Sequence, residues 1–368
     1  MKILDRYVGG SILLSTIFGV LILSLVLVLG NLFKELLDLL INRDVPIMSV
    51  LAFMMYVLPF SMTFTIPWGF LTAVLLVFGR LSADNEIIAF RANGVSIQRI
   101  CFPVFGLAAL LSGICLYINL EVAPRAEMAM KNIIFDMATS NPSTLFAADE
   151  VVSEFPNRRI YVGGKEDDKL YNIIMFELND DDHVVKMIHA KEGKLESDPE
   201  NARLLLKLYD ANFEQRDEKD PANISKVRQG IELKEGVFPI SLEDLYEKHS
   251  TKRRTSTYTF PELLDGIRKN AFEEMLPAKV EANRRFSSAM ACLAFALIAV
   301  PLGITAHRRE TSVGFAFSLV IAFTYFFFII MAETFKNEAA AFPLVLIWIP
   351  NVLFITLGIW LFRRLMKQ

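Results

Sequence analysis

Long apolar and polar stretches alternate in this sequence, and their order leaves few possible folds. Three apolar runs come first, a polar block follows, and three further apolar runs come last. A helix needs about 20 residues to cross the hydrocarbon core of a bilayer, and each run comes close to or exceeds that length. We therefore predict six transmembrane helices, at 7–33, 50–78, 101–122, 286–304, 313–332 and 343–362.

The composition agrees with a protein that has both a membrane part and an aqueous part. Hydrophobic residues make up 53% of the 368 residues, which is high for a soluble domain, yet 21% are charged. The three cysteines, Cys101, Cys115 and Cys292, fall in or beside apolar runs, where a cysteine is usually a small buried hydrophobe. No disulfide framework is predicted.

The arginines and lysines next to the apolar runs predict the orientation of the chain. By the positive-inside rule, short segments rich in these residues stay in the cytoplasm. Four segments qualify: Lys2 and Arg6; Arg80, Arg91 and Arg99; Arg308 and Arg309; and Arg363, Arg364 and Lys367. Both termini are therefore expected in the cytoplasm and the polar block in the periplasm.

The polar block, 124–279, has the pattern of a β-domain. Short apolar runs, at 160–162, 173–176, 184–188 and 204–208, are separated by Gly, Asn, Asp and Pro. This pattern predicts an all-β sandwich or jellyroll. The predicted domains are 1–123 with three membrane helices, 124–279 with the β-domain and linker helices, and 280–368 with the last three membrane helices.

Motifs for enzymatic chemistry are missing from the sequence. There is no phosphate-binding GxxxxGK[ST] loop, no HExxH and no GxSxG, and the four histidines lack metal-ligand spacing. We therefore expect a non-catalytic chain that binds no cofactor or metal itself. We expect no nucleic-acid partner.

The segment between the second and third runs predicts a short cytoplasmic helix at 84–93. Ser82 is a candidate cap, Asp84 and Glu86 complement the positive helix N-terminus, and Gly94 ends the helix. Apolar anchors are supplied by Ile87, Ile88 and Phe90. Such a helix either docks into a soluble partner or lies on lipid headgroups. Glu86 favours the protein partner, because a carboxylate suits a basic groove better than an anionic membrane.

These residues together resemble one family, the permease subunits of the lipopolysaccharide export ABC transporter, over nearly the whole chain. The resemblance rests on motifs that come in a fixed order: Pro59 and Pro67; Gly79, Arg80, Leu81 and Ser82 with Asp84, Glu86, Gly94 and Ser96; Asn119 to Pro124; Glu281, Arg284 and Arg285; Pro301, Leu302 and Gly303; and Trp348, Ile349, Pro350 and Asn351. It implies six helices with a periplasmic jellyroll between the third and fourth.

The resemblance also implies partners and a path for the substrate. The permease would be a dimer, usually of two related subunits, in the inner membrane, and a separate cytoplasmic ATPase dimer would bind ATP and Mg. Lipopolysaccharide would enter from the outer leaflet between the first and fifth helices, rise into the jellyroll, and pass to a periplasmic bridge of similar β-domains. The implied ATPase-coupling residues are Arg80, Asp84, Glu86, Ile87, Phe90 and Arg91, with Glu86 at the acidic contact position.

Cations near the periplasmic membrane boundary are candidates for binding the lipid phosphates. They are Lys34, Arg125, Lys131, Arg284, Arg285 and Lys336. The alternative is that each cation extends to the interface or pairs locally, as Arg284 or Arg285 would with Glu281.

Two other functions remain compatible with the sequence. One is a mechanotransmission or signalling protein whose periplasmic domain senses a ligand without lipid passing through it. The other is a membrane-bound enzyme that acts on lipid at the periplasmic surface.

Overall fold

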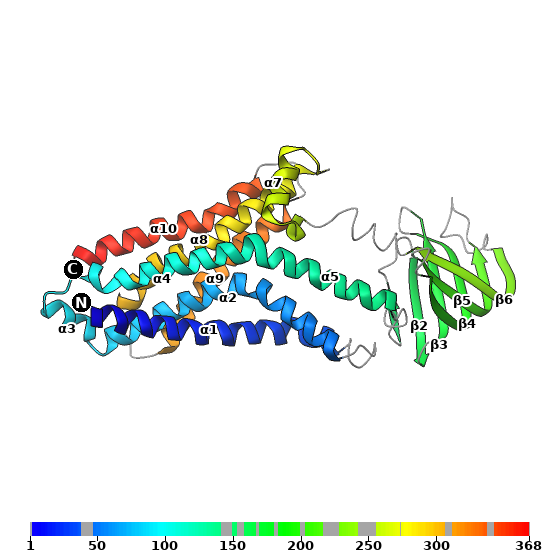
Figure 1. Ribbon diagram of the computed structural model, residues 1–368, viewed down its shortest axis with the longest axis horizontal. Helices are drawn as coiled ribbons and strands as arrows, with labels where there is room; N and C mark the ends of the chain where they lie inside the picture. Colours follow the sequence, from blue (N-terminus) through cyan, green and yellow to red (C-terminus); the bar gives the residue numbers. More distant parts are fainter. Residues whose placement is uncertain are drawn as a thin grey trace. The chain divides into compact units, whose positions relative to one another are not determined.

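The described part of the chain forms two compact units. The computed structural model describes residues 2–37, 47–140, 149–152, 158–166, 169–179, 183–198, 203–215, 228–241, 255–272, 274–305, 311–336 and 342–367. A helical unit comprises Met1–Gly30, Met55–Met128 and Arg254–Gln368, and a second unit comprises Asn31–Met54 and Ala129–Arg253. Figure 1 labels the elements of both units.

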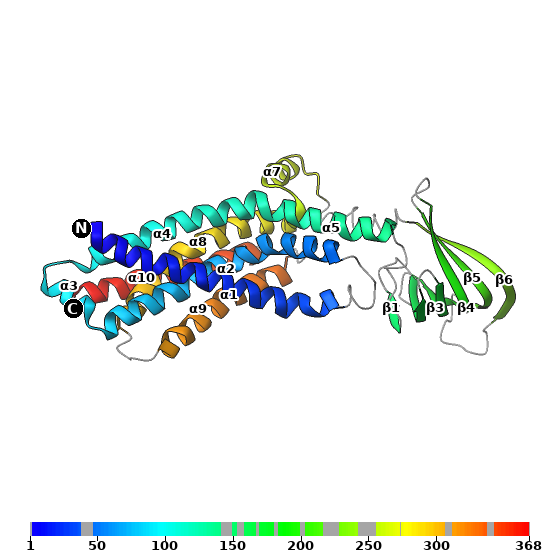
Figure 2. The ribbon, with the colours of Figure 1, turned by 60° about the horizontal axis from the view of Figure 1, so that its bottom comes forward.

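The helical unit contains long helices that run alongside one another, as Figures 1 and 2 show. Six stretches of the described chain are long and apolar enough to cross a membrane, which confirms that part of the prediction. They belong to α1 (Lys2–Leu37), α2 (Ile47–Ala83), α4 (Ile97–Tyr117) with its continuation, α8 (Met275–Thr305), α9 (Thr311–Thr334) and α10 (Phe342–Lys367). The shorter helices are α3 (Glu86–Ala92) and α7 (Phe260–Arg268).

Helices α8 and α2 form the interior of this unit. Within the unit, 72% of the α8 span and 67% of the α2 span are buried, against 22–33% for the other four spans. Small residues allow close helix packing here: a Cβ atom added to Gly358 of α10 would lie only 2.8 Å from the Cβ atom of Leu297 on α8. The peripheral helices therefore leave most of their apolar surface uncovered by this chain.

A buried polar cluster joins three of these helices. The Ser287 hydroxyl on α8 donates to the Ile347 carbonyl (2.7 Å), and the Asn351 amide on α10 donates to the Ser287 carbonyl (3.0 Å). The Tyr325 hydroxyl on α9 donates to the same Ser287 carbonyl (2.9 Å). Since these groups are almost fully buried, the bonds fix the rotation of α8, α9 and α10 about one another.

The third membrane helix, predicted at 101–122, extends beyond residue 122. Helix α4 continues through one π-turn, η2 (Ile118–Val122), into α5 (Ala123–Ser140). Pro124 lacks an N–H group and would clash with a carbonyl of a regular helix, and the wider turn just before it relieves that conflict. The predicted domain boundary at 123/124 thus lies inside a continuous helix, and the one at 279/280 lies inside α8.

The second unit contains one six-stranded antiparallel sheet. Its strands are β1 (Glu150–Val152), β2 (Arg158–Glu166), β3 (Lys169–Leu178), β4 (Val184–Asp198), β5 (Arg203–Gln215) and β6 (Arg228–Ser241). All four predicted β runs lie in these strands. Neighbouring strands in the sheet are also neighbours in sequence, which makes the sheet a meander. A jellyroll would need crossing connections, and the described strands show none.

One side of the sheet is apolar, and a local irregularity extends this apolar face. Asn172 and Asp210 adopt left-handed backbone conformations, with φ of 52° and 49°, which short polar side chains tolerate. They shift the alternation by one residue, so that Leu170 and Ile173, three apart, are both fully buried. The resulting cluster joins β1 to β5 and includes Phe213 and Phe238 at half-buried positions.

A charged row closes one end of this apolar face. Arg158, Glu177 and Lys186 are cross-strand partners in β2, β3 and β4, and they share their face with Ile160, Met175 and Ile188. The Glu177 carboxylate lies 3.4 Å from both the Arg158 guanidinium and the Lys186 amine. The face is therefore amphipathic, with one net positive charge in the row.

Candidate functional site

Helix α3 and its two flanking turns are the first candidate site, and backbone geometry defines both ends of the helix. Asn85, at the N-cap, is left-handed with φ of 58°. At the other end Gly94 has φ of 81°, and the Val95 N–H donates to the Phe90 carbonyl (3.0 Å), which is a Schellman-type ending. The prediction that Gly94 ends the helix is confirmed.

The predicted role of Ser82 as the helix cap is wrong. Ser82 lies in the last turn of α2, and its hydroxyl donates to the Ile304 carbonyl at the end of α8 (2.8 Å). Its side chain is thus used to join α2 to α8, and the chain passes through Asp84 and Asn85 before α3 begins.

Two of the predicted apolar anchors hold α3 against the helical unit, and one does not. Ile87 is 5% exposed and lies in the main core cluster, and Phe90 packs against the same cluster. Ile88, in contrast, is 59% exposed. The outward side of the turn and helix also carries Arg80, Asp84 and Arg91. One side of α3 is therefore packed against the core, and the other side presents a mixed apolar and charged surface.

Glu86 has a partner that sequence reasoning missed. The Tyr7 hydroxyl, on the second turn of α1, donates to Glu86 Oε1 (3.1 Å). Nearby, the Asp5 carboxylate of α1 forms an ion pair with the Arg99 guanidinium of α4, whose N-cap is Ser96. The partners are 79 and 94 residues apart, and no local pattern links them.

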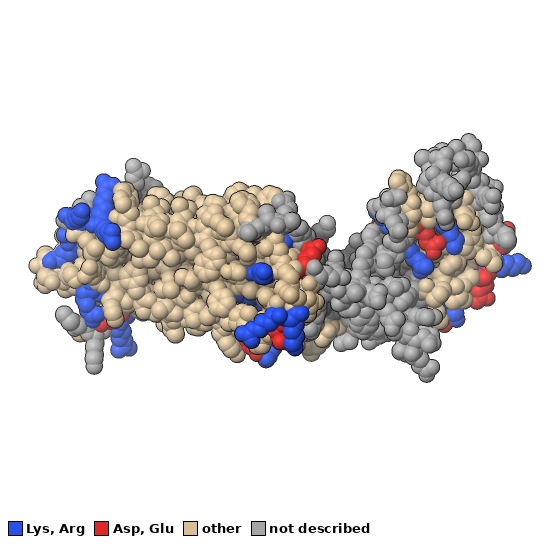
Figure 3. Space-filling model, turned by 90° about the horizontal axis from the view of Figure 1, so that it is seen from above, with Lys and Arg blue, Asp and Glu red and all other residues tan. Residues whose placement is uncertain are grey.

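One group of exposed basic side chains lies at this same end, while Arg125, Arg268, Lys269 and Lys279 are exposed elsewhere in the helical unit. Arg6, Arg80, Arg91, Arg363, Arg364 and Lys367 are all exposed. Figure 3 shows the blue cluster at the end where Figure 1 places α3 and both termini, next to a broad band without charge. By the positive-inside rule such a group favours the cytoplasmic side for this end, and the orientation stays a prediction.

A second candidate site surrounds Glu281 near the start of α8. Its carboxylate accepts hydrogen bonds from Arg284 Nε (2.8 Å), Arg284 Nη2 (2.9 Å) and Arg285 Nε (2.8 Å). Arg284 also lies 3.2 Å from Glu333 of α9. Helical spacing of three and four residues brings both arginines over Glu281, so this pairing follows from the sequence.

Arg285 is an interior residue. Its side chain is 2% exposed, and Nη2 donates to the Ser256 carbonyl (2.9 Å) in the 3₁₀ turn η6 (Thr255–Thr257). Among the described residues, Nη1 is buried and has no hydrogen-bond partner. An arginine so placed requires Glu281, because an unpaired charge in the interior is costly.

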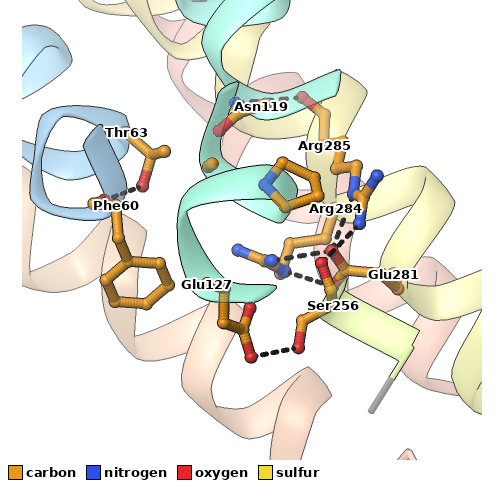
Figure 4. Close-up of a pocket in the computed structure, with 10 residues that line it drawn as sticks. Phe60, Thr63, Asn119, Glu127, Ser256, Glu281, Arg284 and Arg285 are labelled. Atoms are coloured by element: carbon orange, nitrogen blue, oxygen red, sulfur yellow. Dashed lines mark hydrogen bonds and ion pairs between the residues drawn. The ribbon is translucent and has the colours of Figure 1, made fainter. Parts of the chain in front are cut away.

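A small pocket lies beside this cluster. Figure 4 shows the labelled side chains converging from α2, the π-turn, η6 and α8. Its polar lining includes Asn119, whose amide donates to the Arg285 carbonyl (3.4 Å), and Glu127, which accepts from the Ser256 hydroxyl (2.9 Å). Sequence reasoning missed Ser256 and Glu127, because they come from separate segments and belong to no spaced motif.

The predicted lipid-binding cations all have acidic neighbours wherever their side chains are described. Arg125 pairs with Glu121 one turn away and keeps 68% of its side chain exposed, while Lys336 lies 3.7 Å from Glu333. Arg284 and Arg285 share Glu281. The side chains of Lys34 and Lys131 lie outside the described residues. Local pairing, the alternative raised by the sequence, is therefore confirmed for these four cations, and their contact with lipid stays a prediction.

Comparison with known proteins identifies the family. No curated protein matches the chain. A model of the family described as "Lipopolysaccharide export system permease LptF/LptG" matches residues 6–364, which include nearly all of the six apolar spans, α3 and the sheet. That family and the six helices make this a multi-pass inner-membrane component of a transporter. The chain belongs to the LptF/LptG family of lipopolysaccharide export permeases.

Proposed function

We propose that this chain extracts lipopolysaccharide from the outer leaflet of the inner membrane and passes it through its β-sheet unit to a periplasmic bridge. It works as a dimer with a homologous permease subunit. A separate cytoplasmic ATPase dimer, which holds ATP and Mg, drives the cycle by docking on α3. The sheet unit lies in the periplasm and both termini lie in the cytoplasm.

The observation that carries this proposal is the amphipathic face of the sheet. Its central members, among them Ile160, Met175 and Leu206, are fully buried in this structure, so a lipid would first contact the half-buried Phe213 and Phe238 that pack against them. The row of Arg158, Glu177 and Lys186 ends that face with net positive charge. A lipid that carries both acyl chains and phosphates matches such a surface, whereas a small polar signal would not need its apolar extent.

The helical unit supports a lateral route for the lipid. The first and fifth spans, α1 and α9, have large apolar side chains that are more than half exposed in this chain, among them Phe18, Leu21, Phe323 and Phe327. These surfaces suit lipid or a second permease subunit. Of the candidate cations with described side chains, Arg125 is the most accessible to a phosphate.

Photo-crosslinking on strand β6 tests whether lipid moves over this face. Phe238 packs on the apolar face, and its neighbour Val237 points to the opposite side and is 49% exposed. A benzophenone amino acid at Phe238 fits a position that already holds an aromatic ring. The complete complex is reconstituted with labelled lipopolysaccharide and illuminated with ATP or with a non-hydrolysable analogue.

We expect lipid adducts at Phe238 only during ATP hydrolysis and few adducts at Val237. Adducts that are equal at both positions, or that do not depend on hydrolysis, would contradict transport across this face. A complex that hydrolyses ATP but never labels Phe238 would favour the signalling alternative.

A further inference from the structure

The first turns of α1 are joined to the α3 region by two polar contacts, and both lie at the end of the helical unit where α3 projects (Figure 1). One is the hydrogen bond from Tyr7 to Glu86, and the other is the ion pair between Asp5 and Arg99. The two contacts reach the two sides of the same loop, because Glu86 begins α3 and Arg99 lies in the first turn of α4.

The ion pair is better shielded than an ordinary surface pair. The side chains of Arg99 and Asp5 are 29% and 32% exposed, and Asp5 Oδ1 is buried. The Arg99 guanidinium also lies 5.3 Å from the centroid of the Phe102 ring. Contacts on both sides of the guanidinium restrict its rotamers, so the pair retains more of its strength than a mobile surface pair does.

The remainder of α1 packs on the helical unit through a narrow stripe. The buried positions Val8, Ile12, Thr16, Ser24 and Val28 repeat mainly every four residues. At the centre of the stripe, a Cβ atom on Gly19 would lie 3.4 Å from the Gly69 Cα atom, so the two backbones lie close together. Small residues permit this close approach of two helices.

The contacts of α3 link its position to that of α1. Ile87 and Phe90 pack α3 against the core, and the Tyr7 hydroxyl donates to the carboxylate of Glu86, the first residue of α3. A displacement of α3 therefore pulls or releases the N-terminal end of α1, whose apolar body is largely exposed. Tyr7 donates to Oε1 of Glu86, and among the described residues no hydrogen bond to Oε2 is found, which leaves this oxygen for a basic group of a partner.

We propose that Tyr7 and Asp5 are positioning residues that transmit movement of the ATPase-docked loop to α1, the first membrane helix. This inference rests on the proposed function. A partner cation that binds the Glu86 carboxylate competes with the hydrogen bond from Tyr7. The orientation of α1 then changes.

The first test measures lipid released per ATP hydrolysed by the complete complex in proteoliposomes. Tyr7→Phe removes one oxygen atom and leaves the ring. Its matched control is Tyr117→Phe, at a tyrosine that is 64% exposed and makes no hydrogen bond among the described residues. We expect the ratio to fall about fivefold for Tyr7→Phe, the low end of measured coupling between sites, and to stay unchanged for the control.

A charge exchange tests the ion pair. Asp5→Arg alone places two cations together and should lower the ratio, and adding Arg99→Asp should restore most of it, because the pair re-forms with opposite polarity. A double variant no better than Asp5→Arg would overturn the role of this contact, as would a Tyr7→Phe ratio equal to that of the control.

A distance measurement separates failure of this inference from failure of the proposed function, because it needs no lipid transport. Spin labels at Ile3→Cys and Ala92→Cys, both exposed, report the separation of α1 and α3, and the three native cysteines are buried. The distance distribution should be narrow in the otherwise unchanged chain and broaden when Tyr7→Phe and Asp5→Asn are added. An unchanged width would refute the tether even if transport is observed.

Discussion

Loss of the Glu281 carboxylate should destabilise the helical unit more than the loss of either arginine that it binds. Glu281 is 5% exposed and accepts three hydrogen bonds from two guanidinium groups. A hydrogen bond to a charged group contributes about 1.5–3 kcal/mol, so the three would sum to about 5–9 kcal/mol if they were independent. They are not independent, because each arginine keeps a second partner.

The other partners of Arg284 and Arg285 determine how much stability is lost without Glu281. After Glu281→Leu, Arg284 still reaches Glu333 (3.2 Å), and Arg285 still donates to the Ser256 carbonyl (2.9 Å). Arg285 nevertheless stays in the interior without a countercharge. Breaking a buried pair on one side costs about 3–5 kcal/mol, and we expect Glu281→Leu to lower the free energy of unfolding by that amount.

A double-mutant cycle isolates this cause. Adding Arg285→Met to Glu281→Leu removes the stranded charge and should recover part of the loss, because a buried pair replaced by apolar side chains is often neutral. Arg284→Met is the matched control: its side chain is 13% exposed, and Glu281 keeps Arg285. Unfolding in mixed micelles, followed by circular dichroism, measures the parent protein, Glu281→Leu, Arg285→Met and their double variant, together with the Arg284→Met control. If Arg285→Met deepens the loss caused by Glu281→Leu, the reasoning is wrong.

Two further predictions concern the other regions. Ile88→Asp should reduce co-purification of the ATPase by about 30-fold, which is the effect of a central interface residue. Ile3→Asp is the control, because Ile3 is 85% exposed at the same end of the unit, and it should leave co-purification unchanged. Equal retention of the ATPase by both variants would exclude α3 as the docking helix. In the sheet, the hydrogen bond from Lys207 (2.7 Å) lowers the pKa of Glu196, so this contribution to stability is present above the ordinary carboxyl pKa and is lost as the pH falls through the lowered value. The protection of the β4 and β5 amides, measured as the exchange rate relative to the intrinsic rate at the same pH, should therefore fall in acid, and less so in Glu196→Gln; an identical acid response in both proteins would exclude this pair as a cause.

The features that the sequence predicted well depend on local patterns. The membrane helices follow from the length of apolar runs, and α3 from an acidic start, apolar anchors and a final glycine. The pairing of Glu281 with its arginines follows from helical spacing. Each of these signals lies within one or two helical turns, where neighbouring residues determine the geometry.

The features that the sequence did not predict depend on contacts between distant segments. Tyr7 contacts Glu86 only because α1 packs beside α2 and α4. Ser82 does not cap α3, because its hydroxyl donates to a carbonyl of α8. The left-handed residues Asn172 and Asp210 change which side of the strand faces the core, and an alternation pattern cannot show this in advance. The continuation of α4 beyond residue 122 was not predicted, because the π-turn that accommodates Pro124 has no sequence signature.

The pairing of the candidate cations bears on how an exporter releases its cargo. A lysine or arginine without a countercharge would bind a lipid phosphate strongly and retain it. Arg125 beside Glu121, and Lys336 beside Glu333, must share or exchange a carboxylate to bind phosphate, which lowers the net gain in free energy. Passage requires binding strong enough for the lipid to enter and weak enough for it to leave. We infer that the acidic neighbours tune these cations for transfer, so removing Glu121 should slow lipid release while strengthening lipid capture.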